Sequence, residues 1–130
     1  MIVLDASAAC EWLAETDVGH KIAHRLQTEP SLHAPHLLDV EVLSALRKHC
    51  RLGVMTEERA RRSFLALELV PLRRYPHGPL RERIWELRHN FTIYDACYVA
   101  LTEILDATLL TCDEALRHAP LHRGRVEVIT

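Results

Sequence analysis

Residues 1–10 of the chain are MIVLDASAAC, and the step from Leu4 to Asp5 determines the fold that we expect. Residues 2–4 are apolar and include two β-branched side chains, which predicts a short buried strand. The small residues after Asp5 predict that a helix begins immediately after this strand. Ligand-binding groups collect at the carboxyl ends of strands in open parallel sheets. Asp5 is therefore either the N-cap of that helix or a carboxylate with a chemical function.

The length and composition indicate a single globular domain. A chain of 130 residues is long enough to bury one core, and its 48% hydrophobic and 26% charged residues are ordinary for such a domain. No apolar run approaches the roughly 20 residues of a membrane span, and no secretory signal is visible, so we expect a cytoplasmic protein. The net charge of −2 is untypical of a free-standing nucleic-acid binder. However, clustered arginines can form a basic patch beside an acidic pocket.

Short apolar segments alternate with amphipathic ones along the whole chain. We expect strands at residues 2–4, 31–34, 69–72, 108–111 and 126–129, and helices at residues 6–14, 17–27, 37–51, 57–68, 79–89, 92–105 and 114–118. Pro71 restricts its strand to an edge of the sheet. The buried stripe of the helix at residues 92–105 would consist of Ala96, Val99, Ala100 and Ile104. This alternation predicts one three-layer α/β domain over residues 1–130, with a mainly parallel central sheet flanked by helices.

Four acidic residues fall at related places on this skeleton. Asp5 and Asp113 each follow a predicted strand. Glu41 and Asp95 each lie in the first turns of a predicted helix. Because the ends of parallel strands and the starts of the following helices meet at one edge of the sheet, these acids are candidates for one shared site.

Glu41 and Asp95 are the more informative of the four. Glu41 interrupts an apolar run, and Asp95 is embedded among the other residues of 93–97 in a helix that we expect to be buried on most sides. Acidic side chains are almost never fully buried unless they are paired or bind a metal. Taken singly, Asp95 could simply favour the helix N-terminus, and Glu41 could pair with Arg47 or Lys48. Four such coincidences in one small domain favour a shared site.

Several carboxylates without a fixed cation form a hard oxygen site that suits Mg²⁺ or Mn²⁺. Such ions lower the pKa of water and neutralise charge on a phosphoryl oxygen, which is the chemistry of phosphodiester cleavage. The four cysteines lack C-x-x-C spacing, which argues against a zinc knuckle or a disulfide framework. Converging carboxylates also repel one another, so at least one should have a raised pKa in the metal-free protein.

Four motifs resemble those of the PIN-domain ribonucleases, and more narrowly those of the VapC toxins of bacterial toxin–antitoxin pairs. They are IVLDASA at residues 2–8, PHLLDVEVLSAL at 35–46, TIYDACYVAL at 92–101 and LLTCDEAL at 109–116. The resemblance covers essentially the whole chain. One short D-A-S-A motif would be weak, whereas all four in this order and spacing are specific.

The resemblance implies a PIN-like fold and a metal site whose ligands would be Asp5, Glu41, Asp95 and Asp113. Ser7 and Thr111 would lie close to the site, where their hydroxyls hold carboxylates or water. The implied activity is endonucleolytic cleavage of structured RNA that depends on Mg²⁺ or Mn²⁺. The resemblance also implies a homodimer, and inhibition by a small VapB-type antitoxin whose C-terminal segment blocks the acidic pocket.

Two other functions are open to such a chain. A catalytically silent PIN-fold interaction module would use the fold only for dimerisation and partner binding, but it need not retain all four acids. A receiver domain that accepts phosphate on an aspartate would need a lysine at a later strand end, and none follows residues 108–111.

Two acids that neighbour the four candidates in sequence are not expected to belong to the site. Asp39 is expected to be exposed or capping, and Glu114 to point about 100° around the helix from Asp113.

Overall fold

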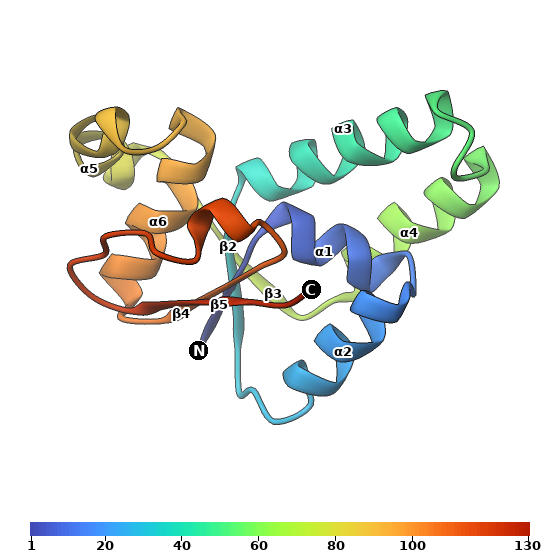
Figure 1. Cartoon of the computed structure of the whole chain (residues 1–130), viewed down its shortest axis with the longest axis horizontal. Helices are drawn as coiled ribbons and strands as arrows, with labels where there is room; N and C mark the ends of the chain where they lie inside the picture. The colour runs from blue at the N-terminus through green and yellow to red at the C-terminus, as the bar shows by residue number, and fades with distance from the viewer.

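Five parallel strands form one sheet with β1 at its centre (Figure 1). The structure is a computed structural model that describes residues 1–130. The strands lie in the order β3-β2-β1-β4-β5, and their bounds are β1 (Ile2–Leu4), β2 (Leu32–Pro35), β3 (Leu72–Tyr75), β4 (Thr108–Thr111) and β5 (Arg125–Val128). The chain leaves β1 toward β2 and later returns to β4 on the other side of β1. In open α/β sheets, such a reversal opens a crevice at the carboxyl ends of the two strands.

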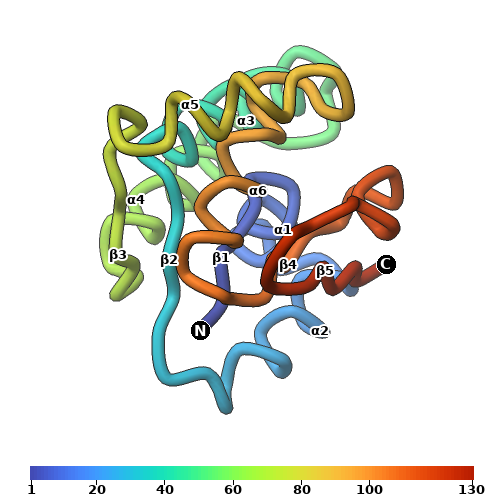
Figure 2. Tube along the Cα trace, turned by 90° about the vertical axis from the view of Figure 1, so that its left-hand side faces the viewer, coloured from blue at the N-terminus to red at the C-terminus, as the bar shows by residue number.

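Helices cover both faces of the sheet. The six α-helices are α1 (Ala6–Leu13), α2 (Asp17–Leu26), α3 (Leu37–Arg51), α4 (Glu57–Leu69), α5 (Arg81–Glu86) and α6 (Ile93–Leu105). Three short 3₁₀ helices are η1 (Gly78–Leu80), η2 (Leu87–His89) and η3 (Glu114–Leu116). Figure 2 shows α6 in front of the sheet and α1 and α2 behind it. α3 and α4 pack together as an arm that extends away from the sheet (Figure 1). None of the helices has the length and apolar composition that crossing a bilayer requires.

The core lies between β1 and the two helical layers. All three residues of β1 are buried, and so are all residues of α6 from Ala96 to Glu103. The largest fully buried side chain is Tyr98 of α6, which is 1% exposed. β1 and α6 therefore form the rigid centre on which the carboxyl edge of the sheet is built.

The predicted elements agree with the structure at most positions. The sheet is parallel throughout, α3 and β4 have the predicted bounds, and the last strand differs by one residue. Thr56 is the N-cap of α4, because its hydroxyl accepts the Arg59 N–H at 3.2 Å. Pro71 precedes an edge strand, as its missing N–H requires.

Four predictions of local structure were wrong in detail. The apolar segment at residues 69–72 is not a strand, because α4 continues to Leu69, which is 86% exposed, and β3 begins only at Leu72. The segment at residues 79–89 is divided into η1, α5 and η2, with Pro79 in the first tight turn. The helix after Asp113 ends at Leu116.

The fourth error concerns the buried stripe of α6. Ile104 is 59% exposed, and the neighbouring Glu103 is 8% exposed in its place. Arg83 of α5 donates to both carboxylate oxygens of Glu103, at 2.7 and 3.1 Å, and the His122 N–H adds a bond of 2.9 Å. The carboxylate is thus fully paired, which is the condition for burying it.

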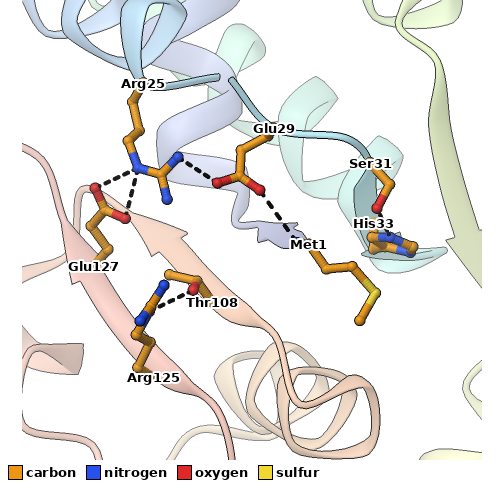
Figure 3. Close-up of polar contacts among 8 residues, drawn as sticks. All are labelled: Met1, Arg25, Glu29, Ser31, His33, Thr108, Arg125 and Glu127. Carbon is orange, nitrogen blue, oxygen red and sulfur yellow. Dashed lines mark hydrogen bonds and ion pairs between the residues drawn. The ribbon is translucent and has the colours of Figure 1, made fainter. Parts of the chain in front are cut away.

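Ion pairs fasten α2 and the chain start to the sheet (Figure 3). Arg25 of α2 donates to Glu127 of β5 at 2.9 Å and to Glu29 at 2.6 Å. The amino group of Met1 donates to the second oxygen of Glu29 at 3.2 Å. These contacts are partly exposed, so their contribution to the free energy of unfolding is modest.

His33 of β2 is a buried histidine away from the carboxyl edge, and it is 6% exposed. Its ring nitrogens form hydrogen bonds with the hydroxyls of Ser31 and Tyr75, both at 2.8 Å. Burial lowers the pKa of His33, and the positive charges of the chain amino group and Arg73 lower it further.

The lowered pKa of His33 predicts a loss of stability in acid. The unfolded chain binds a proton near the ordinary histidine pKa of about 6.5, whereas the folded protein binds it only at lower pH. The contribution of His33 is therefore present above about pH 6.5 and is lost as the pH falls through the folded-state pKa. We expect His33→Gln to be less stable than the parent at about pH 8, and the difference to shrink toward about pH 5. Urea unfolding of both proteins measures this, and a constant difference would contradict it.

Candidate active site

Asp5 closes β1 and lies in the N-cap position of α1, but its side chain does not cap the helix. Its Oδ2 accepts hydrogen bonds from the hydroxyls of Ser7 at 2.5 Å and Thr111 at 2.7 Å. Asp5 is 7% exposed, and its Oδ1 takes part in no hydrogen bond. Of the two roles open to Asp5, the capping role is thus excluded by geometry.

Ser7 and Thr111 join the β1–α1 turn to the end of β4. The Ser7 Oγ accepts the Cys112 N–H at 2.9 Å, and the Thr111 Oγ1 accepts the Asp113 N–H at 3.0 Å. The two hydroxyl oxygens lie 3.2 Å apart. Both side chains therefore hold Asp5 in place and fix the backbone that leads to Asp113.

Glu41 reaches the same edge from the second turn of α3. Its Oε2 accepts a hydrogen bond of 2.5 Å from the hydroxyl of the buried Tyr98, and it forms no ion pair with Arg47 or Lys48. Tyr98 was not among the site residues predicted from the sequence. A signal for it exists, because a tyrosine in a buried helix needs a partner for its hydroxyl.

Asp95 is half-buried in the first turn of α6, where Thr92 is the N-cap. The Thr92 hydroxyl accepts the Asp95 N–H at 3.1 Å and donates to Asp95 Oδ2 at 2.8 Å. The helix is buried on most sides, as predicted, since all residues from Ala96 to Glu103 are buried, but Ile93 and Tyr94 at its start are 46% and 61% exposed. The helix start is open to solvent on one side, which leaves Asp95 accessible.

Asp113 follows β4 and is exposed. Its Oδ1 caps η3 by accepting the Ala115 N–H at 2.9 Å. The neighbouring Glu114 forms an ion pair with Arg117 at 2.6 Å, and Asp39 accepts two bonds of 2.8 Å from Arg74. Asp39 and Glu114 are therefore neutralised elsewhere and do not belong to the acidic site.

The four acids influence one another electrostatically. Burial raises the pKa of Glu41, and the charges of Asp5 and Asp95 raise it further. Burial likewise raises the pKa of Asp95, and Asp5 and Asp113 add to the effect. These directions match the expectation that carboxylates brought together have a raised pKa. None of the four forms an ion pair with a basic side chain.

The donor chemistry of this site fits a hard divalent cation. Each of the four acids keeps one carboxylate oxygen outside any hydrogen bond, and hydroxyl groups hold the other oxygen of three of them. The side chains as placed do not form a closed set of three or more ligands around one point. Carboxylate oxygens are nevertheless the hard ligands that Mg²⁺ and Mn²⁺ prefer.

A groove of about 850 Å³ borders the acidic site, and Ser7, Glu41, Cys10 and Cys112 are among the residues that line it. Burial raises the pKa of Cys10 to about 12 and that of Cys112 to about 11. Both thiols are therefore protonated at neutral pH and are poor nucleophiles. The chemistry of this edge rests on its carboxylates and hydroxyls.

Comparison with known proteins shows the family of the chain. The family model named PIN domain matches residues 2–121 of the chain. The chain belongs to the PIN-domain family. Ribonuclease VapC1 of Mycobacterium tuberculosis is 45% identical over 119 residues, which cover 91% of this chain and 90% of VapC1. Ribonuclease VapC12 of the same species is 37% identical over 129 residues, which cover 99% of each chain.

Solved structures show the same PIN fold. PAE2754 from Pyrobaculum aerophilum has a TM-score of 0.71 at 30% identity, with 98% of this chain and 83% of that chain covered. VapC20 of Mycobacterium tuberculosis, described as a sarcin-ricin loop cleaving toxin, has a TM-score of 0.70 at 20% identity, with 96% and 99% covered. The second likeness concerns the fold alone. The PIN fold, predicted from four motifs, is thus confirmed.

Neutralising Asp95 tests whether the four acids repel one another. Asp95→Asn removes a charge that faces Asp5 and Asp113, while an amide oxygen can still accept the Thr92 hydroxyl. We expect the metal-free variant to be as stable as the parent or more stable, by up to about 1 kcal/mol because partial exposure screens the repulsion.

Thermal melts in EDTA measure this effect, with Glu114→Gln as the matched control. That variant loses an acid of the surface pair with Arg117 and should gain nothing. A clear loss of stability in Asp95→Asn would show that Asp95 acts only as a helix-terminus acid.

Proposed function

We propose that the protein is the toxin of a VapBC-type toxin–antitoxin pair, an endoribonuclease that hydrolyses RNA phosphodiester bonds with Mg²⁺ or Mn²⁺. One observation carries the proposal. Four acids from β1, α3, α6 and the end of β4 meet at one edge without a basic partner, in a chain 45% identical to a VapC ribonuclease. The proposed site of action is the cytoplasm.

The residues that would hold the metal are Asp5, Glu41, Asp95 and Asp113. When bound, a divalent cation would neutralise charge that develops on the phosphoryl oxygens and would lower the pKa of water.

Hydroxyl groups preorganise the acids for this task. Ser7 and Thr111 hold Asp5, Tyr98 holds Glu41, and Thr92 holds Asp95, each by a bond to one carboxylate oxygen. The remaining oxygen of each acid is left for a ligand. Groups that orient metal ligands in this way affect activity about 10–100-fold when they are removed.

A basic partner is the expected inhibitor of such a site. The acids repel one another and have no cation of their own, so an arginine fork could satisfy two carboxylates at once. This supports inhibition by a VapB-type antitoxin whose C-terminal segment enters the acidic pocket. Solved relatives include VapBC2 from Rickettsia felis bound to a promoter DNA fragment, at 15% identity, a TM-score of 0.64 and full coverage of both chains.

Exposed apolar side chains support a homodimer. Trp85, Ile93 and Tyr94 are 63%, 46% and 61% exposed, and they border one hollow of about 570 Å³ with Leu37 and Ile84. Grouped aromatic and aliphatic side chains of this kind are typical of protein interfaces. We propose that a second copy of the chain covers this surface.

The orienting hydroxyl of Thr111 provides the test of the proposed function. We expect the parent protein to cleave RNA with Mg²⁺ or Mn²⁺ and to lose activity in excess EDTA. Thr111→Val should lower the cleavage rate about 10–100-fold because Asp5 loses one of its two donors, and Thr111→Ser should restore most of it.

Thr108→Val is the matched control, because Thr108 lies at the other end of β4 and its hydroxyl accepts a hydrogen bond only from Arg125. It should leave the cleavage rate unchanged. Cleavage that persists in EDTA, or the absence of RNA cleavage by the parent with either metal, would contradict the proposal. The second result would favour the catalytically silent interaction module.

A further inference from the structure

The groove beside the acidic site contains basic side chains as well as acids. At its inner end it is lined by Ser7 and Glu41, and it continues along α3. The cationic residues that line it are Arg47, Lys48 and Arg51. One continuous hollow therefore connects the acids with three positive charges.

The helical geometry of α3 sets the spacing of these charges. Glu41, Ser44 and Lys48 follow one another at i, i+3 and i+7, so they lie along one face of the helix. With a rise of about 1.5 Å per residue, Lys48 lies about 10 Å and Arg51 about 15 Å beyond Glu41 along the helix axis. The cations thus begin close to the acids and extend away from them in one direction.

These three cations have no partner within the protein. Arg47, Lys48 and Arg51 are exposed and take part in no ion pair and no side-chain hydrogen bond. Other arginines contrast with them: Arg25, Arg74, Arg83 and Arg117 are all bonded to carboxylates. The charges of the groove are therefore available to an external anion.

A favourable interaction with the α3 dipole explains why basic residues occur in the last turn of a helix. It does not require that they line the same groove as Glu41. A polyanion that passes over the acids, in contrast, meets these cations next. A nucleic-acid strand has the matching feature, which is a row of regularly spaced phosphates.

We propose that this groove is the path of the RNA strand, and that Arg47, Lys48 and Arg51 bind the phosphates on one side of the bond that is cleaved. This inference rests on the proposed ribonuclease function and adds the direction of the substrate across the protein. The three residues position the substrate and do not touch the reacting atoms. Because phosphate contacts carry no base information, they act on RNA of any sequence.

RNA binding without cleavage tests the path. The affinity of the metal-free protein for a short fluorescent single-stranded RNA is measured in EDTA by anisotropy over a range of salt concentrations. We expect Arg47→Gln, Lys48→Gln and Arg51→Gln each to weaken binding, and each to reduce the slope of log K against log salt by about 0.7. The triple variant should reduce this slope by about three times as much as each single variant does.

Arg123→Gln is the matched control, since Arg123 is also exposed but lies before β5, at the opposite edge of the sheet. It should bind RNA with the affinity and salt slope of the parent. Because all four positions are exposed, thermal melts should coincide for parent and variants, and this comparison verifies the fold.

Three results would overturn the proposed path. They are parent-like binding by the triple variant, an equal loss of slope in Arg123→Gln, and no salt-dependent RNA binding by the parent. Parent-like binding by the triple variant would indicate that the three cations only stabilise the helix terminus or bind an acidic protein segment. A parent that cleaves RNA with Mg²⁺ while the triple variant binds normally refutes the path alone. A parent that binds RNA in this groove but cleaves none with either metal refutes the proposed function instead.

Discussion

The structure depends on how the carboxylate of Asp5 is held at the end of the central strand. Two hydroxyls, from Ser7 and Thr111, donate to a single oxygen of this nearly buried side chain. The adjacency of β1 and β4 in the sheet makes this arrangement possible, because the strand order reverses between them. An acid placed there without donors would carry a large desolvation cost. The two hydroxyls offset that cost and leave the second oxygen for a ligand.

The other acids are supported in the same way but with less burial. Tyr98 and Thr92 each donate to one oxygen of an acid, and these acids retain raised pKa values through burial and mutual repulsion. The metal-free site is therefore strained electrostatically. A divalent cation or a basic partner would relieve the repulsion, so the proposed catalysis and the proposed inhibition would share one physical cause.

Much of the fold was predictable from sequence, because alternation of short apolar strands with amphipathic helices is a local signal. The four acids were proposed from their positions at strand ends and helix starts, and the helix that carries Asp95 is buried on most sides as predicted, except at its exposed start. Features that depend on long-range pairing were not predictable. The Arg83–Glu103 pair, which allows Glu103 to be buried where Ile104 was expected, and the Tyr98–Glu41 bond join residues far apart in the chain.

The central claim, that four acids form one metal site, is tested most directly by Mn²⁺ binding in isothermal titration calorimetry. The parent should bind Mn²⁺, and Asp5→Asn, Glu41→Gln, Asp95→Asn and Asp113→Asn should each weaken binding at least about tenfold. Glu114→Gln, which alters an acid paired with Arg117, should bind like the parent. Parent-like Mn²⁺ affinity in the four site variants, or no binding by the parent, would contradict a shared site.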